Sequence, residues 1–180
     1  YRAYDSILDR DVALKLLKKD KLAPYQSRTF IQEARRMAKV RNRHVLAVHG
    51  ANVYNNKVGM WSDLIDGKNL SSKEQLTTAN LIHIFRSLSH ALEAVHEAEL
   101  IHGDIKPSNA MQDSKGRIVL MDCGAGIESN HELNSSEYKK GTPLYMAPEL
   151  YLGQAISSAT DIYALGTLMY HLVSQEFPVE

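Results

Sequence analysis

The sequence has one cysteine, no excess charge of either sign and no long apolar run, and each absence excludes a class of protein. The single cysteine, Cys123, excludes an internal disulfide and is typical of a reducing compartment, so we expect a cytoplasmic protein. The 21 basic and 21 acidic residues give no net charge, which argues against a nucleic-acid partner. No apolar run approaches the roughly 18 residues of a membrane span, so we expect no membrane segment within residues 1–180.

The chain has about the length of one domain. Its 180 residues are 44% hydrophobic, which is enough to bury a core. No internal repeat or low-complexity tract interrupts it.

The stretch from Ile101 to Asn109 carries the most chemistry in the sequence. Asp104, Lys106 and Asn109 place an acid, a cation and an amide within six residues, too close for a regular helix to present all three on one face. A loop of this kind can hold a carboxylate beside an incoming hydroxyl, and Asn109 can turn back to hold a metal. A second acid, Asp122, follows the apolar run 117–121, so a short strand is expected to feed it into a cleft.

Hydrophobic periodicity predicts alternating strands and helices. We expect strands at 1–5, 12–17, 45–51, 57–65 and 117–121, and helices at 26–40, 79–98 and 158–174. The helix at 79–98 has an apolar stripe that includes Phe85, and its histidines His83, His90 and His96 are interpreted as solvent-facing. The last helix is expected to bury one side that includes Ile162 and Val173.

The order Asp104, Lys106, Asn109 and then Asp122-Cys123-Gly124 resembles that of eukaryotic-type protein serine/threonine kinases, particularly the bacterial ones. Val12-Ala13-Leu14-Lys15 is similar to the strand of that family that carries a phosphate-binding lysine, and Gly141–Glu149 resembles its substrate-docking end. The resemblance implies an α+β fold of two lobes. Residues 1–66 would form a small antiparallel sheet with one helix, and 67–180 a larger, mainly helical lobe. The fold would be truncated at both ends, because the family's glycine-rich loop and last helices have no counterpart here.

The resemblance also implies the reaction and the residues that perform it. ATP and Mg²⁺ would be the cofactors, and the hydroxyl of a protein would be the substrate. Asp104 would accept or orient that hydroxyl, Lys106 would meet the γ-phosphate, and Asn109 and Asp122 would hold the metal. Lys15 would pair with the α- and β-phosphates and with Glu33. Taken alone, Lys15 could be a surface lysine of an edge strand, and Glu33 could pair with a nearby arginine.

A further group of residues is implied at the nucleotide pocket. By the resemblance, Ser62 gates the adenine site, the backbone of residues 63–65 forms the hinge that binds adenine, and the nucleotide-binding residues are Ala13, Asp63, Ile65 and Met111. Asp161 would hold the backbone of the catalytic stretch, with a simple first-turn helix acid as the alternative.

Two departures from the family pattern keep other functions open. Gly103 stands where many members have an arginine, and His-Gly-Asp with an asparagine five residues later also occurs in small-molecule kinases of the aminoglycoside or choline type. Lys106 and the segment 141–149 count against that alternative, and a pseudokinase scaffold is the third. Cys123 replaces a phenylalanine and is interpreted as a small buried hydrophobe, with a reactive thiol as the alternative.

Overall fold

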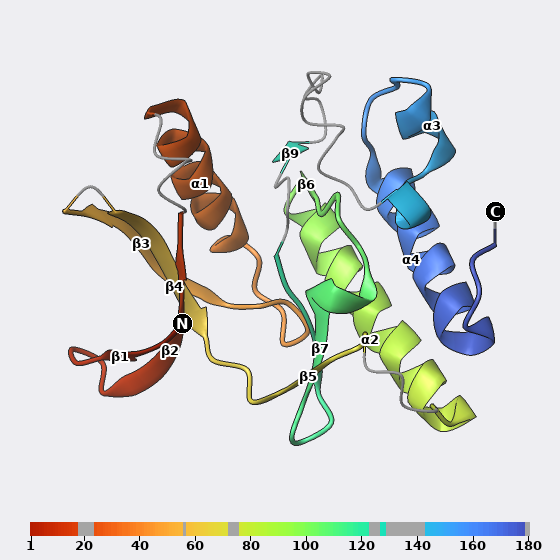
Figure 1. The fold of residues 1–180 in the computed structure, drawn as a ribbon, viewed down its shortest axis with the longest axis horizontal. Coiled ribbons are helices and arrows are strands. Elements are labelled where there is room, and N and C mark those ends of the chain that lie inside the picture. The colour runs from red at the N-terminus through yellow and green to blue at the C-terminus, as the bar shows by residue number, and fades with distance from the viewer. Residues whose placement is uncertain (18–23, 56, 72–75, 123–126, 129–142, 179–180) are drawn as a thin grey trace.

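The computed structural model describes residues 1–17, 24–55, 57–71, 76–122, 127–128 and 143–178. The N-terminal part is a four-stranded antiparallel sheet in the order β1-β2-β4-β3, with one helix packed against β3 and β4. Its elements are β1 (Arg2–Asp5), β2 (Arg10–Leu16), α1 (Pro24–Met37), β3 (Val48–Tyr54) and β4 (Lys57–Asp63). Figure 1 shows this sheet and α1 together on one side of the molecule.

The C-terminal part is built on two long helices that lie side by side, α2 (Thr78–Glu97) and α4 (Ser158–Ser174). Thr77 caps α2 by accepting the backbone N–H of Asn80 at 3.2 Å, the side-chain cap that fixes where a helix begins. Short elements surround the two helices: β5 (Gly67–Asn69), β6 (Leu100–Ile101), β7 (Ala110–Asp113), β8 (Ile118–Leu120), β9 (Ile127–Glu128), α3 (Pro148–Tyr151) and 3₁₀ turns at Pro107–Asn109 and Pro143–Tyr145.

Three apolar clusters are buried among the described residues, and the two larger ones hold these parts together. The smaller core fills the space between α1 and the sheet with Phe30, Ala34, Val58 and Met60. The larger core lies around α2 and α4, and it also takes in Met37, Val40 and Val45 from the N-terminal part. The expected α+β, two-lobed fold is therefore present, while a boundary placed at 66/67 stays a prediction.

The helices at 79–98 and 158–174 and the strands at 1–5, 12–17 and 117–121 are confirmed to within one or two residues. The helix expected at 26–40 ends at Met37, and the strand expected at 57–65 ends at Asp63. The strand expected at 45–51 begins only at Val48. Its first residues instead bond to β8, because the Leu46 N–H donates to the Leu120 carbonyl at 2.9 Å and the Leu120 N–H to the His44 carbonyl at 2.8 Å.

The buried faces predicted for α2 and α4 are only partly confirmed. Ile84, Leu88 and Leu92 of α2 are buried, but Phe85 is 47% exposed, because it lies at the edge of the face that packs on the core. On α4, Ile162 and Val173 are likewise exposed.

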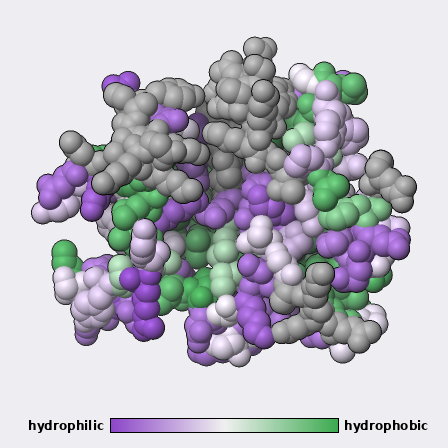
Figure 2. All heavy atoms as spheres, in the orientation of Figure 1, coloured by the Kyte–Doolittle hydropathy of each residue, from purple (hydrophilic) through white to green (hydrophobic). Residues whose placement is uncertain are grey.

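The visible surface mixes polar and apolar groups. In Figure 2, hydrophobic side chains form separate patches between hydrophilic ones on the face shown. No helix within the described ranges is long and apolar enough to cross a membrane. Cys123 and the first two residues of the segment 141–149, which resembles the substrate-docking end, lie outside the described residues.

Candidate functional site

The loop between β6 and β7 brings Asp104, Lys106 and Asn109 into direct contact. The Asn109 side-chain amide donates to both the backbone oxygen and the Oδ2 of Asp104, each at 2.8 Å. Lys106 Nζ lies 2.7 Å from the same Oδ2. The 3₁₀ turn Pro107–Asn109 makes this possible, because it folds the chain back within three residues. The three side chains of the expected cluster therefore lie together, and both Asn109 and Lys106 contact the Asp104 carboxylate.

The β7–β8 hairpin places Asp122 next to this cluster. The register pairs Ala110 with Leu120, and the Met121 N–H donates to the Asn109 carbonyl at 2.8 Å. Asp122 then leaves the strand with a left-handed backbone, φ 47°, which turns the chain sharply after β8. Asn109 and Asp122 are therefore at the same end of one hairpin, as the sequence led us to expect.

Lys15 reaches Asp122 from the N-terminal sheet. Its Nζ lies 2.6 Å from Asp122 Oδ1, across 107 residues of sequence. Both side chains keep substantial exposure, 45% for Lys15 and 42% for Asp122, so this pair is open to solvent where the two parts of the molecule meet. Glu33 lies on α1, and its pairing with Lys15 stays a prediction.

A buried carboxylate holds the start of the stretch 101–109, which carries Asp104, Lys106 and Asn109. Asp161, 1% exposed, accepts the backbone N–H groups of His102 and Gly103, each at 2.8 Å. Gly103 has φ 76°, a left-handed conformation that glycine adopts at little cost. The expectation that Asp161 holds the backbone of this stretch is confirmed, and the alternative of a simple first-turn acid is wrong.

His96 is a residue that the sequence reasoning missed. Its Nε2 donates to Asp161 Oδ2 at 2.8 Å, and its side chain is only 20% exposed, so its interpretation as solvent-facing is wrong. The two residues lie 65 positions apart, and nothing in the helical periodicity of α2 marks His96. The only sequence signal is its place in the last turn of the helix leading to the catalytic stretch.

Replacing His96 by alanine should lower the free energy of unfolding by about 1.5–3 kcal/mol, the contribution of a hydrogen bond to a charged group. The reason is that Asp161 would keep its buried charge with one donor fewer. Urea denaturation measures the change. His90→Ala on the same helix is the matched control, because its ring is 56% exposed, and it should change stability by less than about 0.5 kcal/mol. Equal effects of the two variants would contradict the role given to His96.

His102 is fully buried beside Asp104 and is held in one tautomer. Its Nε2 lies 3.0 Å from the Met121 carbonyl, which needs a donor, and its Nδ1 accepts the Asp104 N–H at 3.3 Å. Burial lowers the pKa of His102, and the nearby charge of Asp161 only partly opposes this. His102 is therefore a neutral ring that ties Asp104 to Met121, next to Asp122.

Stability should fall as the pH drops below about 6.5, where His102 titrates in the unfolded chain. Between that value and its lowered pKa in the folded protein, the unfolded chain binds a proton that the folded chain does not, so the loss approaches about 1.4 kcal/mol per pH unit. Urea denaturation at pH 7.5 and 5.5 measures the loss. His102→Gln, which keeps a donor for the Met121 carbonyl, should give a flatter pH dependence, and an unchanged slope would refute the assignment.

The residues expected around adenine come from β2, β4, β7 and the segment that follows β4. Ala13 pairs with Ser62, which is 5% exposed, and Met111 lies on β7. The Asp63 side chain is engaged elsewhere, because its Oδ1 lies 2.8 Å from His49 Nε2. Ile65 lines a cavity with Arg43 and Arg117. Because the Asp63 carboxylate already contacts His49, the hinge would offer a base its backbone groups.

The arrangement fits a bound magnesium ion in its donor chemistry. Asp122 supplies a carboxylate whose Oδ2 is not used by Lys15, and Asn109 supplies a side-chain oxygen while its nitrogen is used by Asp104. Hard oxygen donors of this kind suit Mg²⁺, which takes one or two protein ligands and completes its shell with phosphates and water. In the described part of the chain, no group of three or more His, Cys, Asp or Glu residues could hold a metal ion.

Comparison with known proteins gives a consistent result. Residues 1–180 match the family described as "Protein kinase domain". Serine/threonine-protein kinase PknD of Chlamydia pneumoniae is 31% identical, over 99% of this chain and 23% of its own length. PknE of Mycobacterium bovis is 29% identical, over 100% and 33%, and PkaB of Streptomyces coelicolor is 30% identical, over 92% and 43%. This chain thus spans less than half the length of these relatives. Because the match covers residues 1–180, this chain belongs to the protein kinase domain family.

Proposed function

We propose that this chain transfers the γ-phosphate of ATP to a serine or threonine hydroxyl of a protein. The observation that carries the proposal is the convergence of Lys15, Asp104, Lys106, Asn109 and Asp122 from β2, the catalytic loop and the end of β8. Three relatives of similar sequence carry the name serine/threonine-protein kinase.

Each group has a task that its chemistry suits. Asp104, held by Asn109 and Lys106, accepts the proton of the substrate hydroxyl as its oxygen attacks the γ-phosphorus, and ADP leaves. Lys106, two residues beyond Asp104, neutralises the transferred phosphate, and Lys15 meets the α- and β-phosphates as a point charge. Magnesium at Asp122 and Asn109 would add positive charge at the phosphate oxygens. Most of the rate would come from positioning and charge neutralisation, since the transition state is loose.

The nucleotide would lie between β2 and β7, beside Ala13 and Met111, with adenine against the backbone of residues 63–65. Glu33 would pair with Lys15 when phosphates replace Asp122 as its partner. A single cysteine and the use of ATP favour the cytoplasm as the place of this reaction.

The proposal is tested by transfer of radiolabelled phosphate from ATP. The purified protein should label casein-like proteins on serine or threonine in the presence of Mg²⁺, and EDTA should stop the reaction. An aminoglycoside and choline panel forms the second arm, since Gly103 is shared with kinases of that type. Labelling of the small molecules alone would overturn the proposal in favour of that alternative. Nucleotide binding without transfer to either class would favour a pseudokinase.

A further inference from the structure

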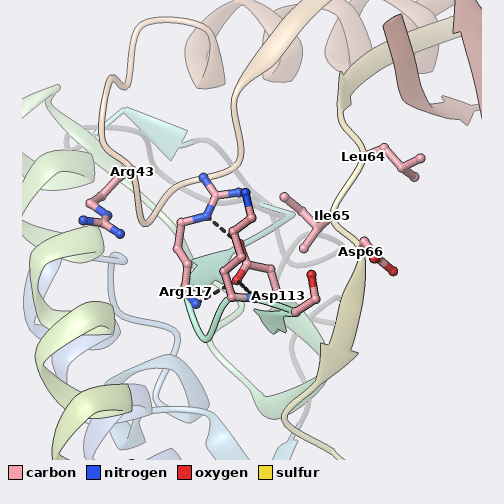
Figure 3. A pocket seen from close by; sticks show the side chains of 8 residues that line it. Arg43, Leu64, Ile65, Asp66, Asp113 and Arg117 are labelled. Atoms are coloured by element: carbon pink, nitrogen blue, oxygen red, sulfur yellow. Dashed lines mark hydrogen bonds and ion pairs between the residues drawn. The ribbon is translucent and has the colours of Figure 1, made fainter.

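A second site lies beside the hinge, apart from the catalytic cluster. An open cavity of about 460 Å³ is lined by three chain segments: the connection from α1 to β3 with Arg43, the hinge with Leu64 and Ile65, and the turn from β7 to β8. In the view of Figure 3, the Arg117–Asp113 pair lies between Arg43 on one side and Ile65 on the other. This volume lies within the range of ligand-binding clefts.

One carboxylate of the cavity already has its charge balanced by a neighbouring cation. Asp113 accepts the backbone N–H groups of Lys115 and Arg117 at 3.0 and 2.8 Å, and Arg117 Nε at 2.9 Å. Burial alone would raise the pKa of Asp113, but the hydrogen bonds from Arg117 and Lys115 outweigh it and hold the pKa below its ordinary value. Asp113 therefore stays ionised, and its charge is matched by Arg117.

The remaining charges favour an anion. The lining has three cations, Arg43, Lys115 and Arg117, against two carboxylates, Asp66 and Asp113, so its net charge is 3 − 2 = +1. Arg43 and Lys115 are exposed, and among the described residues neither side chain forms a hydrogen bond or ion pair. Within the same ranges the Arg117 side chain bonds to Asp113 through Nε only, which leaves its terminal nitrogens available as donors.

The hinge adds an aliphatic surface to these cations. In Figure 3 the Ile65 side chain points toward Arg117, whereas Leu64, 37% exposed, points to the other side of the hinge. A ligand that fills the cavity would therefore need a branched apolar side chain next to acidic groups. Since Arg117 and Arg43 follow one another on one side of Ile65, an extended segment can place an apolar residue on Ile65 and carboxylates near the two arginines.

We propose that this cavity, formed by Arg43, Leu64, Ile65 and residues 113–117, docks an acidic peptide segment of another protein, with a leucine-like side chain next to its carboxylates. The apolar side chain packs on Ile65, and the carboxylates pair with Arg43, Lys115 and the free end of Arg117. The site does not depend on phosphate transfer, because it uses none of the residues assigned to that reaction except Leu64 and Ile65, whose backbone alone is needed at the nucleotide.

The test is fluorescence anisotropy of the purified protein with a short labelled peptide that alternates leucine and glutamate. Binding should weaken at high salt. It should also weaken about tenfold or more when glutamate is replaced by lysine or leucine by serine in the peptide. The double variant Arg43→Glu and Lys115→Glu should lose binding by a similar factor, since it converts attraction into repulsion. Both side chains are exposed and without partners in the described ranges, so the thermal midpoint should not change.

The matched control is the double variant Lys57→Glu and Arg86→Glu. It makes the same change in net charge at two exposed residues that are not part of the cavity, and it should change affinity by less than about twofold. The proposal is overturned if the glutamate peptide does not bind, or if the two double variants weaken it equally. It is also overturned if the serine-for-leucine peptide or a single-stranded oligonucleotide binds as tightly, because the site would then be a non-specific basic surface.

Discussion

Replacing Asp104 by asparagine should lower the rate of phosphate transfer to protein by about 10²–10⁴-fold, the contribution of a positioned general base. Asparagine has nearly the same shape and can still accept the hydrogen bond from Asn109, so the loop should keep its structure. What is lost is the negative charge that takes the proton and pairs with Lys106 at 2.7 Å. Initial rates with radiolabelled ATP measure the loss.

Nucleotide affinity, followed with a fluorescent ATP analogue, should stay within about twofold, because Asp104 faces the substrate hydroxyl and not the nucleotide. Asp9→Asn in the exposed turn between β1 and β2 is the matched control and should be fully active. An Asp104→Asn protein that keeps more than about a tenth of the normal rate would show that another group accepts the proton.

Replacing Lys15 by methionine should reduce phosphate transfer by at least about 10²–10³-fold, as expected when one fixed cation at the developing charge is lost. The fold should survive. The ion pair with Asp122 is roughly half exposed at both ends, and such pairs contribute only about 0–1 kcal/mol to stability. Loss of activity and retention of stability therefore separate a functional lysine from a structural one.

Lys57→Met on β4 is the control for this variant, since it removes an exposed lysine from the same sheet. Both proteins should have thermal midpoints within a few degrees of the unchanged chain. If Lys15→Met turns over ATP at the normal rate, or if Lys57→Met loses as much activity, Lys15 has no special task at the phosphates.

Much of the site could be predicted from the sequence, because short spacings along the chain bring several of its residues together. Asp104, Lys106 and Asn109 lie within one loop, and Asp122 is fixed by a short hairpin, so their proximity follows from few assumptions. Helix α2 was predicted from its period of 3.6, and only Phe85 at the edge of the stripe was misplaced.

Contacts between distant segments could not be predicted in this way. The bond from His96 to Asp161 and the attachment of residues 44–46 to β8 depend on how α2, α4 and the hairpin pack. The cavity beside the hinge likewise needs three segments that periodicity treats separately. Periodicity and propensity report what one segment prefers, whereas these features depend on tertiary packing, which decides them after the elements have formed.

The attachment of residues 44–46 to β8 also determines how the two lobes can move. The sheet is joined to the helical part at this bridge, where His44 Nδ1 also lies 2.8 Å from the Ile118 carbonyl, and at the covalent segment 64–66. A rotation of the sheet about the line through these two attachments leaves both of them intact. We therefore expect hinge bending about that axis and little sliding or twisting between the lobes. The distance from Lys15 Nζ to Asp122 Oδ1, 2.6 Å here, would then serve as a single coordinate for how far the lobes have opened.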